Sequence, residues 1–302
     1  CQDADVTITC NVAALVIDAQ NHGWAAIGGR GLMWFDAALS VVQDDEDHRI
    51  NLPDRGSVIG DVVLSLALPD PSQGPLANTV WIGRSKGGLS VLDHRGTLRD
   101  QRDDRWNLSR GDSFTMADGL RASRVQAVLV RPSGAWLGLG PLGALGSGLQ
   151  RLDLADLTVA PPLLTDRAPP SNFISAIAVG APQTRFAGQV LVGLGSRSQA
   201  GQLELNDPLN NADDRWTRHS TLGTDGDGKA PWTGLAGDNV QALLLQQDRL
   251  WLGSLETQWD AATKRYVDGG LSVWDQGAWT ERGYDALTPS APGLKDGSVA
   301  AL

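Results

Sequence analysis

Several residue types are scarce in this chain of 302 residues, which has 2 cysteines, 2 tyrosines, 4 phenylalanines and a net charge of −10. No apolar run approaches the roughly 18 residues that a membrane-spanning helix needs. A protein that binds duplex DNA or an anionic membrane needs a basic face, so the acidic charge disfavours both partners. A hydrophobic fraction of 41% and a charged fraction of 20% exclude a disordered tail and a collagen-like fibre.

Tryptophan and glycine, in contrast, are abundant, with 11 and 36 residues respectively. Their regular placement indicates a repeat protein. A hydrophobic residue followed by glycine ends a short apolar run five times, at spacings of 55, 55, 55 and 60 residues. The five copies are Ile27-Gly28, Ile82-Gly83, Leu137-Gly138, Val192-Gly193 and Leu252-Gly253.

Three further elements accompany these copies. A Gly-Leu pair with Asp four positions after the Leu, as at Gly88-Leu89 and Asp93, predicts a strand that ends in a turn. A β-branched residue with a small residue two positions later, as at Val63 and Ser65, predicts an inner strand where space is short. A tryptophan after an acidic turn, as at Trp106, predicts an outer strand. Four short strands per repeat are typical of a propeller blade, so we predict an all-β propeller of four-stranded blades.

The repeat predicts five complete blades between residues 11 and 297, and their expected ranges are 11–57, 58–122, 123–171, 172–238 and 239–297. Residues 1–10 are expected to form an N-terminal strand or tether. Residues 298–302 repeat the inner-strand pattern and are expected to begin a further blade. Because that blade lacks its middle, we expect the chain to be a fragment of a longer protein. A shorter ring closed in another way is the alternative.

The repeat resembles the two-component regulator propeller repeat of bacteria. The resemblance rests on Trp81-Ile-Gly, on Lys86-Gly-Gly-Leu-Ser-Val-Leu-Asp93 and on Asp238-Asn-Val-Gln-Ala-Leu243, and it extends over most of the chain. This chain has Arg84 or Ser254 where the family has threonine after its Trp-Ile-Gly step. The resemblance implies six to eight blades and a periplasmic sensor region that precedes a signalling module.

Both cysteines, Cys1 and Cys10, precede the first blade. A chain that starts with cysteine is typical of a mature bacterial lipoprotein anchored through Cys1. A Cys1–Cys10 disulfide that holds the N-terminal strand is the second interpretation. An arbitrary chain start with two ordinary thiols is the third. The first two interpretations place the protein outside the cytoplasm.

Motifs for catalysis or metal binding are weak in this sequence. It has no His-Glu-x-x-His motif, and no histidine stands at metal-ligand spacing from another histidine or a cysteine. We therefore expect the four histidines, His22, His48, His94 and His219, to be solvated loop residues. Asp225 and Asp227 alternate with glycine and form the best candidate for a Ca²⁺ site, although Lys229 stands where a third ligand is needed. A plain turn is the alternative.

Two long insertions are expected on one face of the propeller. One is residues 217–238, between the fourth and fifth blades, and the other is residues 254–268, within the fifth blade. Long insertions on a rigid scaffold often carry function, and Trp and Tyr suit a carbohydrate or protein surface. The candidate binding residues are His219, Trp232, Trp259, Asp260, Arg265 and Tyr266. The alternative is that the tryptophans only pin the loops to the blade.

These features lead to three functional hypotheses. The first is a non-enzymatic extracytoplasmic propeller that binds a protein or a glycan, as a scaffold or a subunit of a surface assembly. The second is the ligand-sensing region of a two-component-type receptor. The third is a propeller-based glycan lyase or hydrolase, for which Asp225, Asp227, Asp260 and Tyr266 form the cluster to test. No cofactor other than the candidate calcium ion is expected, and no nucleic-acid partner is expected.

Overall fold

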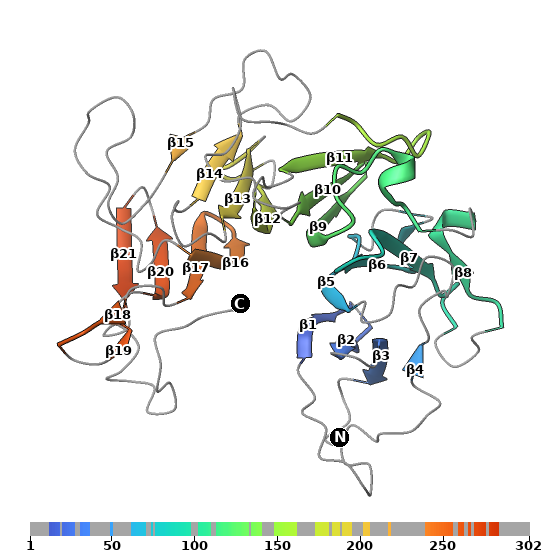
Figure 1. The fold of residues 1–302 in the computed structure, drawn as a ribbon, viewed down its shortest axis with the longest axis horizontal. Helices are drawn as coiled ribbons and strands as arrows, with labels where there is room; N and C mark the ends of the chain where they lie inside the picture. Colours follow the sequence, from blue (N-terminus) through green and yellow to red (C-terminus); the bar gives the residue numbers. More distant parts are fainter. Residues whose placement is uncertain are drawn as a thin grey trace, which may run out of the picture. The chain divides into compact units, whose positions relative to one another are not determined.

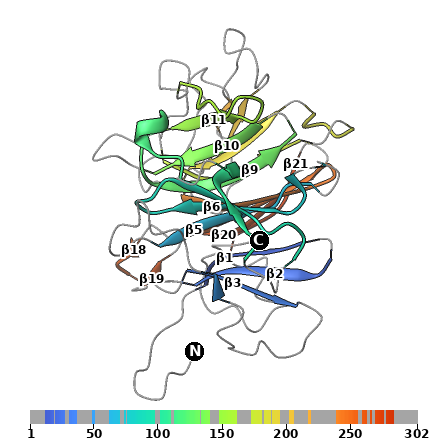
Figure 2. The same cartoon turned by 90° about the vertical axis from the view of Figure 1, so that its right-hand side faces the viewer.

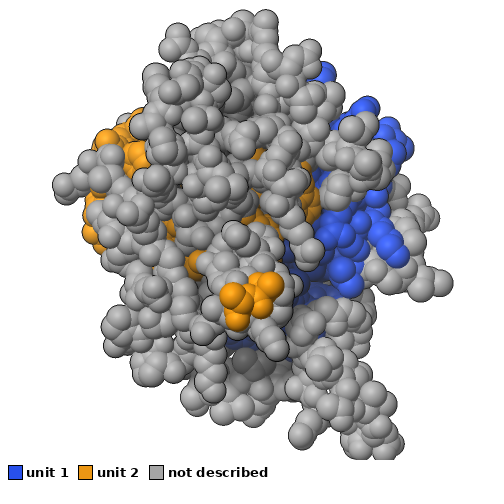
Figure 3. Space-filling view, turned by 60° about the vertical axis from the view of Figure 1, so that its left-hand side comes forward, with its two compact units in different colours: residues 1–142, 150–162 blue, residues 143–149, 163–302 orange. Residues whose placement is uncertain are grey.

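Antiparallel β-strands form almost all of the regular structure in the computed structural model of the chain (Figure 1 and Figure 2). The structure describes residues 12–18, 20–27, 31–36, 49–50, 62–70, 74, 76–97, 102–109, 113–132, 134–140, 148–161, 173–180, 183–187, 189–194, 202–205, 217–218, 239–255, 259–262, 265–266, 269–275 and 278–283. The chain divides into two compact units, one of residues 1–142 and 150–162 and the other of residues 143–149 and 163–302 (Figure 3). Among the described residues, no helix has the length and the apolar character needed to cross a membrane.

Unit 1 contains three antiparallel sheets, each built from strands that follow one another in the sequence. The first sheet consists of β1 (Val12–Ile17), β2 (His22–Ile27), β3 (Gly31–Asp36) and β4 (Arg49–Ile50). The second consists of β5 (Val63–Ala67), β6 (Thr79–Arg84), β7 (Leu89–Asp93) and β8 (Arg105–Trp106). The third has three described strands, β9 (Val125–Arg131), β10 (Gly134–Leu139) and β11 (Leu149–Asp153). Short 3₁₀ turns lie at Asn107–Ser109 and Met116–Asp118.

Unit 2 contains two further four-stranded sheets and one small hairpin. The fourth sheet consists of β12 (Ile174–Val179), β13 (Val190–Leu194), β14 (Gln202–Leu205) and β15 (Thr217–Arg218). The fifth consists of β16 (Asn239–Gln246), β17 (Arg249–Leu255), β20 (Gly270–Asp275) and β21 (Ala278–Gly283). The hairpin consists of β18 (Trp259–Asp260) and β19 (Arg265–Tyr266). The all-β class predicted from the repeat is therefore confirmed, and the sheets are antiparallel.

The small residue of each inner strand faces the glycine of the next strand, which explains why the two recur together. The pairs are Ser65–Gly83, Ala127–Gly138, Ala176–Gly193 and Ala242–Gly253. Each inner strand also carries a β-bulge between its β-branched residue and this small residue. A Cβ atom on Gly83 would lie 2.6 Å from the carbonyl oxygen of Val125 in the neighbouring third sheet. Glycine at this position therefore lets two sheets approach closely.

In the first sheet, the strand register differs from the one that the sequence repeat predicts. There, Ala14 pairs with Ala26, and Val12 pairs with Ile27. Ala26 thus occupies the position that Gly83 has in the second sheet, and the predicted centre at Ile27-Gly28 is wrong by two residues. A small side chain again stands opposite the small residue of the inner strand, and in this sheet it is alanine.

The glycine of the Gly-Leu pair stands at the start of the third strand of a sheet, and at Gly88, directly before β7, the backbone conformation calls for glycine. Gly88 has φ +75°, in the left-handed region that favours glycine. A Cβ atom there would lie 2.0 Å from the carbonyl oxygen of Phe114. Phe114 forms a backbone bridge with Leu89, the residue after this glycine. The loop before the third sheet is therefore held against the start of β7.

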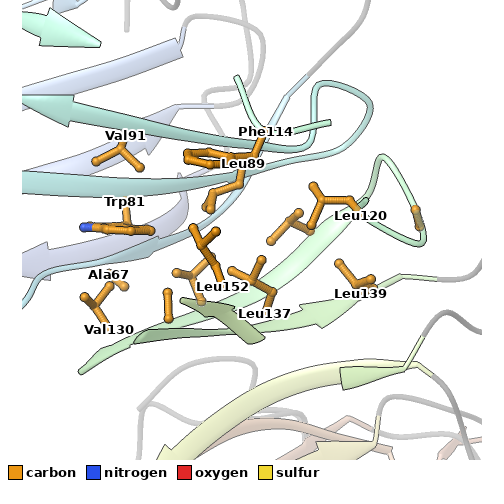
Figure 4. Close-up of a cluster of buried hydrophobic side chains, with 14 residues drawn as sticks. Ala67, Trp81, Leu89, Val91, Phe114, Leu120, Val130, Leu137, Leu139 and Leu152 are labelled. Carbon is orange, nitrogen blue, oxygen red and sulfur yellow. The ribbon is translucent and has the colours of Figure 1, made fainter. Parts of the chain in front are cut away.

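The sheets of unit 1 pack face to face through fixed positions of the repeat. Figure 2 shows β1–β3, β5–β6 and β9–β11 as successive layers. Between the second and third sheets, Trp81 is fully buried in a cluster with Val130, Leu137 and Leu152 (Figure 4). Its indole Nε1 donates a hydrogen bond of 3.0 Å to the hydroxyl of Thr79. Full burial of such a side chain contributes about 1.5–3 kcal/mol, so this layer is a major source of stability in unit 1.

One buried amide ties together the loops at the edge of the third sheet. Gln150 is fully buried on β11. Its Oε1 accepts a hydrogen bond of 2.7 Å from the backbone N–H of Arg121. Its Nε2 donates to the carbonyl oxygens of Gly119, at 3.1 Å, and Ala160, at 2.9 Å. The amide is satisfied at both ends, as a buried polar group must be.

Candidate functional site

The predicted binding segment within the fifth repeat lies between two paired strands of a well-formed sheet. β17 and β20 are hydrogen-bonded neighbours, with Trp251 opposite Val273 and Ser254 opposite Gly270. The chain between these strands leaves the sheet at Leu255 and returns at Gly270. A rigid sheet that presents an inserted segment is a common support for a binding site.

This inserted segment forms a two-stranded hairpin, whereas the sequence analysis treated it only as a long loop. In the hairpin, Trp259 of β18 pairs with Tyr266 of β19, and Asp260 pairs with Arg265. Figure 1 shows β18 and β19 at one end of the fifth sheet, near the start of β20 and the end of β21. The strand pairing therefore places four of the predicted binding residues on one hairpin, in two directly opposed pairs.

The remaining predicted site residues lie outside the described residues. They are His219 and Trp232, the calcium candidates Asp225 and Asp227, and the cysteines Cys1 and Cys10. Among the residues that the structure describes, no group of three or more His, Cys, Asp and Glu side chains could hold a metal ion.

The strands beneath the hairpin are linked by polar contacts at their other end. The guanidinium group of Arg249 on β17 forms an ion pair with the carboxylate of Asp275 on β20, with Nε 3.0 Å from Oδ2. The same guanidinium lies 5.8 Å from the ring centre of Trp251. Half of the Arg249 side chain is exposed, so the ion pair itself adds little stability. The register of β17 against β20 is held by their backbone pairing, in which Leu250 faces Trp274 and Leu252 faces Ser272.

A second cluster, formed by Asp18, His22, Trp24, Trp34 and His94, was missed by the sequence analysis. His94, which follows β7, lies over the indole ring of Trp24 with ring centres 5.3 Å apart. Trp24 pairs with Trp34 across β2 and β3. The rings of His22 and Trp34 meet at right angles, with ring centres 6.5 Å apart. The cluster therefore joins the first sheet to the second within unit 1.

The expectation that His22 and His94 are solvated loop residues is wrong. His94 is 9% exposed, because its ring is covered by Trp24 of the neighbouring sheet. The His22 side chain is 31% exposed, and its Nδ1 lies 3.0 Å from the carboxylate of Asp18. The other oxygen of that carboxylate accepts hydrogen bonds from the backbone N–H groups of Gln20 and His22. His48 and His219 lie outside the described residues.

Burial sets the electrostatic character of this cluster. Desolvation lowers the pKa of His94 below 6.5, against the opposing effect of the Asp93 and Asp18 carboxylates. The backbone N–H of Gly96 donates to His94 Nδ1 at 3.3 Å, which fits a neutral ring with its proton on Nε2. A neutral, stacked imidazole fills the space between two sheets, so we assign His94 a packing role. The spacing Asp18-x-x-x-His22 and the facing tryptophans are the sequence signals that could have revealed the cluster.

Comparisons with known proteins identify the fold. No protein-family model matches the sequence, and no match to a curated protein is found. Solved structures do match. PorZ, a surface component of the type-IX secretion system of Porphyromonas gingivalis, is 14% identical over 97% of this chain and 36% of its own, with a TM-score of 0.58. The extracellular domain of a putative hybrid two-component system from B. thetaiotaomicron is 14% identical over 96% of this chain and 36% of its own, with a TM-score of 0.52.

The third likeness is to the WD40 repeats of RRP9, at 9% identity over 92% of this chain and 63% of that chain, with a TM-score of 0.54. This chain thus spans 36% of the length of the two bacterial structures. WD40 repeats build β-propellers from four-stranded blades. Together with the successive antiparallel sheets, the likeness identifies the fold of this chain as a β-propeller.

Proposed function

We propose that this chain is a non-enzymatic, extracytoplasmic propeller module that binds a protein or a glycan through the β18–β19 hairpin. The observation that carries the proposal is the register of that hairpin, which opposes Trp259 to Tyr266 and Asp260 to Arg265 on an insertion between two strands of a formed sheet. The likeness to an extracellular domain and to a secretion-system surface component supports a place outside the cytoplasm.

The residue types of the hairpin suit recognition. Tryptophan and tyrosine offer large, rigid aromatic area at low entropic cost, and they are enriched where binding energy concentrates. An aspartate and an arginine beside them supply an acceptor and a planar set of donors for hydroxyl, amide or carboxylate groups. Such a set fits a sugar ring or a peptide surface of mixed polarity. His219 and Trp232 are proposed to extend the same binding surface.

A photo-crosslinking experiment tests this proposal. A photoreactive amino acid is placed at position 259 or 266, and as a control at position 116, where the methionine side chain is exposed in unit 1. We expect covalent adducts from the two hairpin positions in cells that make the protein, and none from position 116. Mass spectrometry then identifies the adduct as protein or glycan. Equal labelling at all three positions would contradict a site on the hairpin.

Binding measurements with the identified partner complete the test. A Trp259→Ala, Tyr266→Ala double variant should bind at least roughly 30-fold more weakly, since a single hot-spot aromatic already contributes about 2 kcal/mol or more. A Met116→Ala variant should bind like the wild type. Unchanged affinity of the double variant would place the binding surface elsewhere.

A ligand-sensing role within a receptor is the second candidate. It is favoured by the likeness to the extracellular domain of a putative hybrid two-component system. The two roles differ in what ligand binding causes. A sensor changes the activity of a linked kinase domain when ligand binds, whereas a scaffold retains its partner without such an output.

The roles of the two cysteines and of the candidate calcium site are also proposals. Cys1 is proposed as a lipid anchor or as one half of a Cys1–Cys10 disulfide. An intact mass of the native protein with and without reductant separates these, because a lipid adds mass and a disulfide gains about two mass units on reduction. Asp225 and Asp227 are proposed as weak Ca²⁺ ligands.

A further inference from the structure

One buried contact joins the first two sheets of unit 1. His94 follows β7 and is 9% exposed, and its ring centre lies 5.3 Å from that of Trp24 on β2, which is fully buried. Trp24 also packs in an apolar cluster with Val80 and Leu92 of the second sheet. Among the described residues, the indole Nε1 of Trp24 has no hydrogen-bond partner. The contact between the two rings, which we call the imidazole–indole joint, therefore depends on packing.

The turn that carries His94 is held by hydrogen bonds to and from this residue. The backbone N–H of His94 donates to the carbonyl oxygen of Asn78 at 3.1 Å, and its carbonyl oxygen accepts from the N–H of Thr97 at 2.8 Å. The ring takes part as well, because Nδ1 accepts from the N–H of Gly96 at 3.3 Å. A ring nitrogen accepts a hydrogen bond only while it is unprotonated. An imidazolium ring, which carries a proton on both nitrogens, cannot make this bond.

Ionisable groups act on the His94 ring from both sheets. On its own side, the Asp93 carboxylate accepts from the backbone N–H of Arg95 and lies 3.9 Å from the Arg95 guanidinium. In the first sheet, the Asp18 carboxylate lies 3.0 Å from Nδ1 of His22. Burial lowers the pKa of His94 more than the two carboxylates raise it, and a positive charge on His22 lowers it further. The closed joint therefore favours a neutral ring.

We propose that the imidazole–indole joint is a proton-operated contact, in which a proton taken up by Nδ1 of His94 releases the turn after β7 from the first sheet. The proton displaces the N–H of Gly96 and leaves a charged ring against a buried indole. Opening the turn returns that ring to water, which solvates the charge. Because an imidazole in water binds its proton at about pH 6.5, the closed joint is favoured above that pH and is weakened as the pH falls below it. The proposal does not depend on the function assigned to the hairpin.

Amide hydrogen exchange, followed by NMR and corrected for the intrinsic pH dependence of exchange, tests the proposal. The reporters are the N–H groups of His94 and Thr97, which are both bonded in the closed turn. Uptake of one proton changes an equilibrium at most about tenfold per pH unit, so we expect a roughly 3- to 30-fold loss of protection between about pH 6.5 and pH 5. The N–H of Leu120, bonded to Thr115 in another turn of unit 1, is the internal control and should keep its protection.

A His94→Gln variant should lose this pH dependence, because its amide oxygen can accept from Gly96 but takes up no proton in this range. Two neighbouring variants should act in opposite directions. His22→Gln removes a group that lowers the pKa of His94, so it should shrink the effect of acid. Asp18→Asn removes a carboxylate that raises the pKa of His94, so it should enlarge the effect, while the asparagine oxygen can still accept from the backbone of its turn. A side chain that only fills space would give neither change.

Several results would overturn the proposal. One is protection that stays constant or rises on acidification, as it would for an imidazolium that remains stacked on the indole of Trp24. Others are an unchanged pH dependence in His94→Gln, and an equal loss of protection at Leu120, which would indicate unfolding of the whole unit. Far-ultraviolet circular dichroism checks that the variants fold. If His94→Gln does not fold, the His22→Gln and Asp18→Asn variants decide, and changes in the same direction would contradict the proposal.

Discussion

Adding one methyl group at Gly83 tests the idea that this glycine is a spacer between the second and third sheets. A Cβ atom at that position would lie 2.2 Å from Oγ of Ser65 and 2.6 Å from the carbonyl oxygen of Val125. The serine hydroxyl can rotate away, but the backbone carbonyl of β9 cannot move without displacing the third sheet. We therefore expect Gly83→Ala to destabilise unit 1.

The magnitude follows from two opposing contributions. Overpacking of a tight interface costs about 1–3 kcal/mol. Alanine regains about 0.5–1 kcal/mol, because glycine loses more backbone entropy on folding. We expect a net loss of roughly 1–2 kcal/mol, which lowers the melting temperature by about 2–8 °C for a unit of this size.

Gly193 provides the matched control, because it has the same place in the fourth sheet. A Cβ atom there would lie 3.0 Å from Cγ1 and 3.2 Å from the carbonyl oxygen of Val240, so a shift of a few tenths of an ångström suffices. We expect Gly193→Ala to change the free energy of unfolding by less than about 0.5 kcal/mol, since a smaller overlap meets a similar entropic gain.

Calorimetry and hydrogen exchange provide the measurement. Calorimetry gives the change in each variant, and exchange of the β5, β6 and β9 amides shows whether the loss is in unit 1. A Ser65→Ala, Gly83→Ala double variant should recover only part of the stability, because the clash with the Val125 carbonyl remains. Equal costs at Gly83 and Gly193, or a fully stable Gly83→Ala variant, would refute the spacer explanation.

Three further predictions follow from single groups. Burial lowers the pKa of His94, so the unfolded chain takes up a proton near pH 6.5 before the native state does, and this residue's contribution to stability is lost as the pH falls through that range. A His94→Phe variant should therefore lose less unfolding free energy between pH 7.5 and pH 5 than the wild type, as measured by urea titration; an equal loss would contradict a buried neutral ring. Gln150→Leu should destabilise unit 1 by about 1–3 kcal/mol, because it leaves the Arg121 N–H and the carbonyl groups of Gly119 and Ala160 without this partner; a melting temperature within one degree of the wild type would show that water replaces the amide. If Asp225 and Asp227 bind Ca²⁺, a chelator should lower the melting temperature of the wild type and leave that of an Asp225→Asn, Asp227→Asn variant unchanged; no shift in either protein would remove the calcium proposal.

The glycine pattern shows how far local sequence specified this fold and where it failed. Most copies of the hydrophobic-Gly pair lie on the second strand of a sheet, opposite the small residue of the inner strand. In the first sheet, the local pattern selected Gly28, whereas the register uses Ala26. The sequence shows only that a small residue recurs, and strand pairing decides which small residue faces the partner.

The candidate sites also combine features that the sequence indicates with features that only the fold decides. Trp259, Asp260, Arg265 and Tyr266 were singled out from their residue types and from the length of the insertion, but their pairing in a hairpin is a property of the fold. His94 was assigned to solvent because it follows a strand beside turn-forming residues. It is buried because Trp24, far away in the sequence, lies beneath it.

The sequence by itself determined the β class and the repeat, because alternation, glycine and turn residues act over a few neighbouring positions. Only the tertiary structure decided which face of each strand is covered. Val125 and Val12 occupy the same place in the repeat, yet one is fully buried and the other is 57% exposed. Val125 is buried because it packs against residues of the second sheet, and such contacts join residues that are distant in the chain.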